Sequence, residues 1–341
     1  MSIAFEVPEN LKDQYRFHQG QNITIKAIID GEEMRRSYSI CSSPLDNELR
    51  VAVKKILLGK FSHHANSKLR IGDSVEVLPP SGKFYTELKK DQKKNYLAFA
   101  AGSGITPILS IIKTTLATEP GSSFTLIFGN KNRSSIIFKE QLEAVKNLYM
   151  SRFIIHHILS REKMDAPIYH GRIDAEKCEA LNGKLLDINS IHEVFLCGPQ
   201  DMIFSVRDWL LEKGMEKKKI HFELFLTPGT EKAQDLPDSV LKKELEGKSS
   251  RITVRLDGVA FDFDLAFNGE AILDEALKQG ADLPFACKGG VCATCKARLL
   301  EGEVEMDTNY ALESDETAAG FILTCQSHPR TERVVVDFDA K

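Results

Sequence analysis

The segment Cys287-Lys288-Gly289-Gly290-Val291-Cys292-Ala293-Thr294-Cys295 is the most informative stretch of this 341-residue chain. Its spacing is C-x4-C-x2-C, and a further cysteine, Cys325, follows after 29 intervening residues. Plant-type [2Fe–2S] centres are held by four thiolates at this kind of spacing. Gly289 and Gly290 suit such a loop, because backbone that packs around sulfide often needs positive φ or close approach. The stretch therefore predicts a [2Fe–2S] cluster with these ligands: Cys287, Cys292, Cys295 and Cys325.

Two other uses of these cysteines fit the sequence less well. Structural zinc sites usually present two matched C-x2-C pairs, and this sequence has no second pair of that spacing. A disulfide framework is not expected, because the chain is long, its seven cysteines are unevenly spread and no signal peptide is visible. A [2Fe–2S] centre moves one electron at a time, so we expect the rest of the chain to provide the electron source.

Length and composition indicate a globular protein with room for two or three domains. Hydrophobic residues make up 42% of the chain and charged residues 28%, as in ordinary soluble proteins. No apolar run approaches the ~18–20 residues that span a bilayer, and the N-terminus lacks the pattern of an export signal. We therefore expect a cytoplasmic protein with no nucleic-acid partner and no membrane partner.

Charge is distributed unevenly along the chain. The net charge is −4, but the residues from 251 onward carry 9 basic and 17 acidic side chains, and the first 250 residues carry a net charge of +4. Such asymmetry indicates either a docking surface or a well-solvated acidic face, and the sequence favours neither. If it is a docking surface, we expect it to steer encounter with a basic patch on the partner.

Residues 1–90 have the pattern of a small antiparallel barrel made of short strands between glycines and prolines. In the strand from Arg36 to Ile40, alternation places Arg36 and Tyr38 on one face and Ser39 on the other. An arginine beside a tyrosine can hold a phosphate and cover an aromatic ring. The later segment Gly59-Lys60-Phe61-Ser62 could receive a pyrophosphate at a helix start. The other predicted strands are Ile23 to Ile29, Glu48 to Lys54 and Ser74 to Leu78.

From Asn95 to Leu226, strand-like and helical stretches alternate, which predicts a parallel sheet with ligands at the carboxyl ends of its strands. The segment Gly102 to Pro107 connects an apolar strand, Tyr96 to Ala100, to a helix over Ile108 to Leu116. Its spacing, G-x-G-x-x-P, is incomplete as a dinucleotide fingerprint, so a phosphate-binding turn and a merely tight turn remain equal interpretations. Further strands are predicted at Phe124 to Phe128, Phe153 to Leu159, Val194 to Leu196 and His221 to Leu226, with helices at Ser135 to Tyr149 and from Pro199 through Trp209.

Residues 227–250 are rich in Pro, Gly, Lys and Glu, which predicts a linker. After it, Arg251 to Phe263 has the pattern of a hairpin that turns at Asp257-Gly258. A helix at Ala271 to Gln279 and strands at Lys296 to Glu303 and Val334 to Phe338 would complete a small α+β domain around the cysteine loop. The predicted domains are therefore 1–90, 91–226 and 251–341.

In this order, the motifs resemble the ferredoxin–NADP reductase superfamily fused to a C-terminal plant-type ferredoxin domain. Arg36-Ser37-Tyr38-Ser39 resembles its flavin motif R-x-Y-S, and Gly59 to Ser62 resembles its pyrophosphate segment G-x-x-S, which implies FAD over FMN. Gly102 to Pro107 and Cys197 to Met202 resemble its two nicotinamide-nucleotide motifs. The implied architecture is a flavin-binding antiparallel β-barrel, a parallel α/β nucleotide domain and a β-grasp iron–sulfur domain. That barrel normally begins with a strand before the segment matching Ser2 to Val7, so translation is expected to begin upstream of Met1, or the barrel to lack an edge.

The resemblance implies catalytic roles for Ser39 near flavin N5, Cys197 beside the nicotinamide, and Glu223 in proton and charge traffic near N5. A buried strand-end cysteine and a solvated edge-strand carboxylate are the alternatives for Cys197 and Glu223. The FAD residues implied are Arg36, Tyr38, Ser39, Ile40, Lys54, Gly59, Phe61, Ser62 and Phe225, the last as a cover for the ring. The NADPH residues implied are Gly102, Gly104, Thr106, Pro107, Arg133, Ser160, Arg161, Cys197, Gly198, Pro199 and Met202.

Charge favours NADPH over NADH. NAD sites usually place a carboxylate on the ribose 2′-OH, whereas a 2′-phosphate is bound by arginine. The strand ending at Gly129 is followed by Asn130-Lys131-Asn132-Arg133, which contains no carboxylate, and Ser160-Arg161 resembles the 2′-phosphate pair of the superfamily.

The favoured hypothesis is a reductase that passes electrons from NADPH through FAD and the cluster to an oxygenase. Arg36 to Pro44 and the domain order resemble more narrowly the reductase components of the di-iron monooxygenases of phenylacetate degradation. A reductase for another client, such as a ring-hydroxylating dioxygenase, and a non-catalytic electron-transfer subunit are the alternatives.

Overall fold

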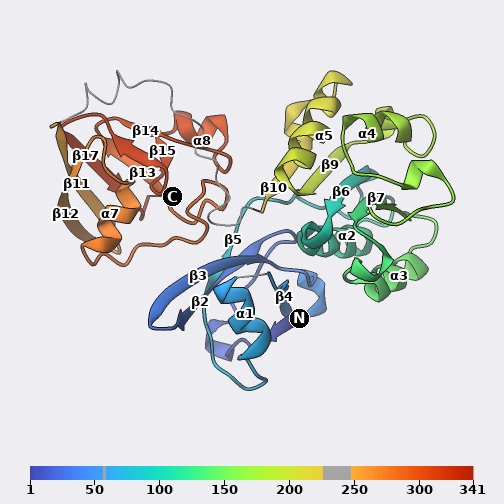
Figure 1. The fold of residues 1–341 in the computed structure, drawn as a ribbon, viewed down its shortest axis with the longest axis horizontal. Helices are drawn as coiled ribbons and strands as arrows, with labels where there is room; N and C mark the ends of the chain where they lie inside the picture. The colour runs from blue at the N-terminus through green and yellow to red at the C-terminus, as the bar shows by residue number, and fades with distance from the viewer. Residues whose placement is uncertain (57–58, 226–246, 341) are drawn as a thin grey trace. The chain divides into compact units, whose positions relative to one another are not determined.

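The computed structural model describes residues 1–56, 59–225 and 247–340 (Figure 1). They form two compact units: the larger comprises Met1–Met34 and Tyr38–Phe225, and the smaller comprises Arg35–Ser37 and the described residues from 247 to 340. Most of the predicted linker, 227–250, lies outside the described residues. Among the helices that the structure describes, none is both long and apolar enough to cross a membrane.

The N-terminal part of the larger unit is an antiparallel barrel of two short sheets, as predicted (Figure 1). Its elements are β1 (Ser2–Phe5), β2 (Asn22–Ile29), β3 (Glu32–Ser39), β4 (Leu49–Ala52), α1 (Lys60–Ser67) and β5 (Glu76–Ser81). Strand β1 pairs with β4, and β2 lies between β3 and β5. Ile23, Ile25 and Val51 are fully buried in its core.

The second part of the larger unit is a five-stranded parallel sheet with helices packed against it, as predicted. Its elements are β6 (Asn95–Ala101), α2 (Ile105–Thr118), β7 (Ser123–Asn130), α3 (Lys139–Leu148), β8 (Phe153–Leu159), α4 (Ala175–Leu181), β9 (Glu193–Gly198), α5 (Gln200–Glu212) and β10 (Ile220–Leu224). The strand order is β10-β9-β6-β7-β8. Helix α3 begins four residues later than predicted, because Phe138 adopts the left-handed conformation, with φ of 58°. Helix α4 was not predicted.

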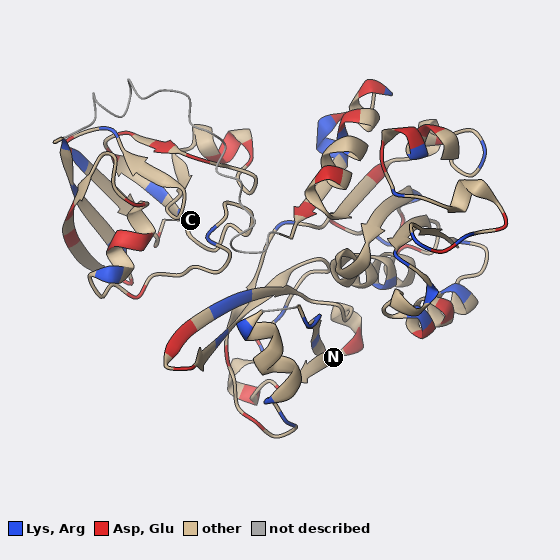
Figure 2. Ribbon diagram, in the orientation of Figure 1, with Lys and Arg blue, Asp and Glu red and all other residues tan. Residues whose placement is uncertain are grey.

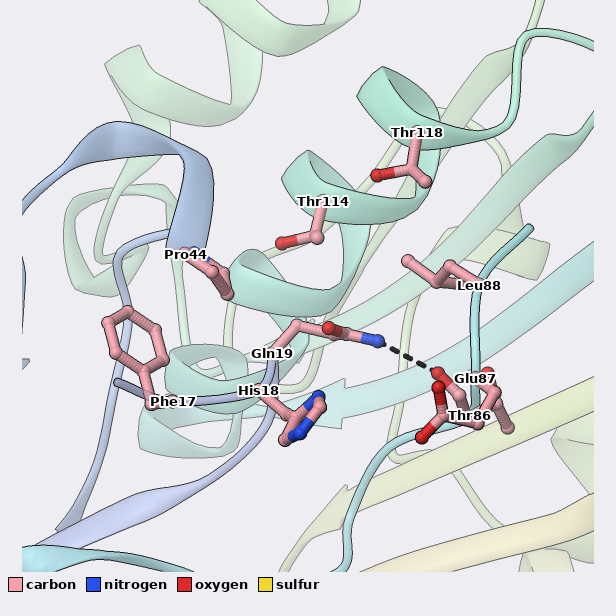
Figure 3. Close-up of a pocket in the computed structure, with 9 residues that line it drawn as sticks. All are labelled: Phe17, His18, Gln19, Pro44, Thr86, Glu87, Leu88, Thr114 and Thr118. Atoms are coloured by element: carbon pink, nitrogen blue, oxygen red, sulfur yellow. Dashed lines mark hydrogen bonds between the residues drawn. The ribbon is translucent and has the colours of Figure 1, made fainter. Parts of the chain in front are cut away.

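A polar seam joins the barrel to helix α2. Ser110 Oγ donates a hydrogen bond to Ser42 O at 2.6 Å, and Ser43 Oγ lies 2.9 Å from Thr114 Oγ1. Lys113 on the same helix pairs with Asp46. Beside the seam is a shallow hollow, lined in part by Thr114, where Gln19 Nε2 donates to Thr86 O at 2.8 Å (Figure 3). The seam fixes the helix that follows the glycine turn against the barrel strands.

The smaller unit is an α+β fold with the strand order β12-β11-β17-β13-β15 and a separate β14-β16 pair. Its elements are β11 (Ser249–Leu256), β12 (Val259–Ala266), α7 (Ile272–Lys278), β13 (Lys296–Glu301), β14 (Val304–Met306), α8 (Ser314–Ala318), β15 (Phe321–Leu323), β16 (Ser327–Pro329) and β17 (Arg333–Asp337). The hairpin turns at Asp257-Gly258 as predicted, with φ of 52° and 74°, the conformation of a type I′ turn. Strands β11 and β17 pair in parallel, which completes the predicted β-grasp sheet.

Candidate functional site

The three residues predicted to be catalytic lie together where the barrel meets the parallel sheet. Ser39 ends β3, and its Oγ donates a hydrogen bond to Glu223 Oε2 at 2.9 Å. Glu223 on β10 stands in register with Cys197 on the neighbouring strand β9. Ser39 is 6% exposed and Cys197 is fully buried, so the group is shielded from bulk water. This arrangement makes Glu223 a partly buried, hydrogen-bonded carboxylate, in contrast to the alternative of a solvated one.

The thiol of Cys197 is neutral at ordinary pH. Burial raises its pKa well above the usual value, and the negative charge of Glu223 raises it further. Cys197 is thus a buried cysteine at a strand end, as the alternative interpretation required, and it also lies at the carboxyl end of the sheet where a nicotinamide is expected. The role of Cys197 stays a prediction.

The glycine turn packs directly on the end of β9. A Cβ on Gly104 would come within 2.1 Å of Cys197 O and 2.9 Å of Gly198 N, so only glycine allows this approach. Gly102 has a φ of 53°, and Lys54 Nζ lies 4.0 Å from where its Cβ would be. The two predicted nucleotide motifs, and Lys54 from the barrel, therefore converge on one place.

The remaining residues of the two nucleotide motifs begin helices. Thr106 and Pro107 are buried in the first turn of α2, where Thr106 Oγ1 donates to Ser103 O at 2.9 Å. Pro199 precedes α5, and Met202 packs so closely on Gly198 that a Cβ there would come within 2.7 Å of Met202 Cε. Both helices start at the carboxyl ends of strands, the geometry that favours anionic ligands.

Some of the predicted flavin residues are partly exposed, and others are buried in the core of the barrel. Tyr38 lies beside Phe61 with ring centroids 5.8 Å apart, and Arg36 Nη1 donates to the adjacent backbone carbonyl at 2.7 Å. Ile40 and Phe61 are buried in the barrel core, so their side chains serve packing, and contact with a cofactor is left to their backbones. Phe225 is 36% exposed.

Helix α1 begins after Gly59 without a side-chain cap. Ser62 Oγ donates to Gly59 O and accepts from Ile56 N, both at 3.1 Å, which fixes the turn before the helix. The N–H groups of an uncapped first turn are free to bind a phosphate. An uncapped turn with Tyr38 beside Phe61 of the same helix fits FAD.

The ends of β7 and β8 are tied together where an adenosine ribose is expected. Ser160 N donates to Asn130 O at 2.9 Å, and Arg161 N donates to Lys131 O at 2.8 Å. The next residue, Glu162, accepts a hydrogen bond from Arg133 N at 2.8 Å and pairs with the Arg133 side chain at 3.3 Å. Sequence reasoning placed Arg133 at this site but missed Glu162, although it directly follows the predicted 2′-phosphate pair.

The four cysteines of the smaller unit lie as two pairs. Cys287 lies next to Cys292, and Cys295 next to Cys325, closely enough that the thiols of each pair shift one another's pKa. Among the described residues, no three His, Cys, Asp or Glu side chains converge on a single metal position. A [2Fe–2S] cluster takes two thiolates on each iron. The pairing therefore fits the cluster.

The loop around these thiols is rich in N–H donors. Gly289 N donates to Cys287 Sγ at 3.3 Å, and the backbone of Gly290 donates to Cys325. Lys288 and Ala293 adopt left-handed φ values of 53° and 54°, which turn the backbone around the sulfurs. A hydrogen bond from the Cys287 thiol lowers the pKa of Cys292, and one from Cys295 lowers the pKa of Cys325. The same contacts raise the pKa of Cys287 and of Cys295, so in each pair one thiol more readily becomes the thiolate that binds iron.

Comparison with known proteins agrees with this geometry. Family models match in the predicted order: an oxidoreductase FAD-binding domain at residues 2–85, an oxidoreductase NAD-binding domain at 99–208 and a 2Fe-2S iron-sulfur cluster binding domain at 254–330. One of the subunits of the 1,2-phenylacetyl-CoA epoxidase of Escherichia coli K12 is 48% identical over 341 residues, which cover all of this chain and 94% of that protein. The chain belongs to the family of oxygenase reductase components.

A reductase component named for another oxygenase is also similar to this chain. The ferredoxin reductase component of the 3-ketosteroid-9-alpha-monooxygenase of Rhodococcus rhodochrous is 31% identical over 99% of this chain and 92% of its own length. The solved structure of phthalate dioxygenase reductase shares the fold, with a TM-score of 0.52 and 24% identity over 94% of this chain and 88% of that one. The NAD-binding match spans Gly102 to Pro107, which favours the phosphate-binding interpretation of that turn.

Three buried thiols of the reductase that are not predicted cluster ligands should make its stability depend on pH. Burial raises the pKa of Cys41 and of Cys178 to about 12, and Cys197 is raised well above its usual value. In the unfolded chain these thiols ionise near their ordinary value of 9.0. Ionisation therefore favours the unfolded state as pH rises from 9 toward 12, and the stability gained from burying neutral thiols is fully present only below pH 9.

We expect Cys178→Ala to make this decline shallower by about 1.4 kcal/mol per pH unit above pH 9, the effect of one titrating group. Urea unfolding between pH 7 and 10.5, followed by the fluorescence of the single tryptophan, Trp209, measures it. Trp209 lies on α5 and donates to Glu179 of α4, the helix that carries Cys178, so it reports on this region. Equal slopes for the two proteins would contradict the expectation.

Proposed function

We propose that this chain takes hydride from NADPH and delivers the electrons to a di-iron epoxidase that acts on phenylacetyl-CoA. Bound FAD would accept the hydride, and a [2Fe–2S] cluster would hand on single electrons. One observation supports the phenylacetyl-CoA epoxidase as the electron acceptor. This chain is 48% identical over its whole length to a subunit of such an epoxidase, but only 31% identical to the steroid monooxygenase reductase.

In this proposal, the residues of the chain position the cofactors and hold protons. The turn at Gly104 and the end of β9 would bind the nicotinamide nucleotide, and the neutral Cys197 thiol would lie beside it. Ser39 and Glu223 form one hydrogen-bonded pair, in which the carboxylate orients Ser39, and this pair would hold the proton and charge beside a bound flavin. Holding two rings in contact is the main requirement for hydride transfer, because the chemistry belongs to the cofactors.

The identity of the electron-accepting oxygenase is tested by reconstitution. The purified reductase is mixed with the oxygenase components of a phenylacetyl-CoA epoxidase, and NADPH oxidation is followed with and without phenylacetyl-CoA. We expect oxidation that depends on the thioester and forms epoxide in step with NADPH. A ring-hydroxylating dioxygenase with its aromatic substrate is the matched control, and equal or faster turnover with it would reject the proposed client. Failure to reduce cytochrome c with NADPH would instead support a non-catalytic role.

Nucleotide preference is tested at Arg161. We expect Arg161→Ala to lower kcat/KM for NADPH by about 10- to 100-fold and to change that for NADH by less than about twofold, because a charge-assisted hydrogen bond to a 2′-phosphate is lost. Glu162→Gln is the complementary variant. It releases Arg133 from its carboxylate partner and should raise the preference for NADPH. Equal losses with both nucleotides in Arg161→Ala would contradict the assignment.

The acidic smaller unit should make electron delivery sensitive to salt. Acidic residues are distributed over its helices, strands and loops in Figure 2, and the chain from residue 251 onward has 17 acidic against 9 basic residues. We expect the second-order rate of oxygenase reduction to fall several-fold between about 0.05 and 0.5 M salt, because screening shortens the reach of these charges. A rate that does not change with salt, measured by stopped flow, would indicate a merely solvated face.

A further inference from the structure

The carboxamide of Gln326 joins the two parts of the chain that carry the cluster cysteines. Its Nε2 donates to Lys288 O in the cysteine loop at 2.8 Å and to Cys325 O at 2.9 Å, and it lies 3.8 Å from Cys325 Sγ. The residue is 9% exposed. A carboxamide has two N–H bonds. The two short bonds to carbonyl oxygens therefore occupy both, and the sulfur shares one of them.

The position of Gln326 is itself fixed by backbone hydrogen bonds. Gln326 N donates to Leu323 O at 2.9 Å, and Asp307 N donates to Gln326 O at 2.9 Å. The side chain therefore extends from an anchored backbone toward the loop. Its ordering costs less entropy than that of an exposed glutamine.

The loop side of the contact is equally close. Lys288 has a left-handed φ of 53°. Gly290 has a φ of 71°, and a Cβ there would come within 2.8 Å of Thr308 O and 3.3 Å of Gln326 Cγ. Tyr310 N also donates to Gly290 O at 3.1 Å. The loop is therefore held at two successive points, Lys288 by Gln326 and Gly290 by Tyr310.

We propose that Gln326 is a positioning residue that latches the loop bearing three cluster ligands to the segment bearing Cys325. The latch keeps the two thiol pairs at the separation that a cluster requires. Its N–H also points at a ligand sulfur, and hydrogen bonds to sulfur favour the more negative, reduced state. The inference rests on the cluster assignment and not on the client, so a failed epoxidase reconstitution leaves it standing.

The test compares the full-length, cofactor-loaded wild type with Gln326→Leu. The leucine fills a similar volume but donates no hydrogen bond. We expect the EPR signal of the reduced cluster to be lost to a chelator about 10-fold faster, in line with the usual effect of losing a partner of a metal ligand. We also expect the one-electron reduction equilibrium to shift about threefold toward the oxidised form, the effect of one modest hydrogen bond. A purely structural role of Gln326 would leave the reduction potential of the cluster unchanged, so this potential distinguishes the two roles.

Gln279→Leu is the matched control, because Gln279 is an exposed glutamine of the same unit whose amide donates to Glu275. The rate of cluster loss to the chelator and the reduction potential of the cluster should both stay at wild-type values in this variant. A Gln326→Leu protein that loses its cluster within twofold of the wild-type rate at an unchanged potential would overturn the proposal. If the variant is isolated with flavin but no cluster, the cluster-free forms are compared by thermal unfolding. Equal midpoints support the latch, and a lower midpoint for the variant overturns it in favour of general destabilisation.

Discussion

Cys292→Ala is expected to abolish delivery of electrons to a protein acceptor and to leave the flavin site working. Cys292 and Cys287 form one of the two thiol pairs, so its loss leaves one iron position with a single thiolate. Since loss of an outer partner of a metal site already costs about 10- to 100-fold, loss of a ligand should lower NADPH-driven cytochrome c reduction by more than about 100-fold. The measurement is steady-state reduction of cytochrome c alongside ferricyanide, which accepts electrons directly from flavin.

The matched control is Cys41→Ala, which removes a buried thiol from the barrel. We expect it to keep the EPR signal and both activities. A Cys292→Ala protein that still shows a reduced-cluster EPR signal and near wild-type cytochrome c reduction would contradict the ligand assignment. Equal losses of the cytochrome c and ferricyanide activities would show instead that the substitution had damaged the larger unit.

Glu223→Gln is expected to have the second largest effect, on the reduction of bound flavin by NADPH. The substitution keeps the shape of the side chain but removes the charge that accepts the Ser39 hydrogen bond at 2.9 Å. If Ser39 and Glu223 hold the proton and charge that accompany hydride transfer, the rate at which NADPH reduces the flavin should fall by roughly 100-fold. This is the lower end of the usual contribution of a general acid or base. Stopped-flow absorbance under anaerobic conditions measures it.

Glu193→Gln is a matched control on the neighbouring strand, where the carboxylate pairs with Lys94 and His221 at the opposite end of the sheet. We expect it to alter stability and to leave flavin reduction within about twofold, because Glu193 lies at the end of the sheet where ligands do not bind. Similar losses in both variants would show that the effect of Glu223 comes through the sheet and not through the flavin site.

The parts of the fold that followed from the sequence are those in which local and tertiary preferences agree. The apolar run from Tyr96 to Ala100 and the glycines after it can only be a buried strand and a tight turn, and Asp257-Gly258 accepts the positive φ values of a type I′ turn. Pro79 and Pro80 indicated the end of a strand. In the structure, β5 contains both, because it is an edge strand whose outer side needs no hydrogen-bond donors.

The short elements around the cysteine loop could not be predicted in the same way. Strands β14, β15 and β16 have three residues each, too few to show a period, and α8 has five. The same holds for the candidate site. The cysteine spacing is a local pattern and could be recognised in the sequence. The contact of Gln326 with Lys288 and the pairing of Glu162 with Arg133 could not, because they join residues that are 38 and 29 positions apart.

The separation of the thiol pairs along the chain has a consequence for how the protein is made. The larger unit ends at Phe225 and has its own buried core, so its flavin and nucleotide sites can form while the ribosome is still adding the rest. Cys325 emerges 30 residues after Cys295, so the second thiol pair cannot form until nearly the whole smaller unit has been synthesised. All four thiolates of the cluster are therefore available only after Cys325 has been made, and a chain interrupted before it would keep the larger unit without a complete ligand set.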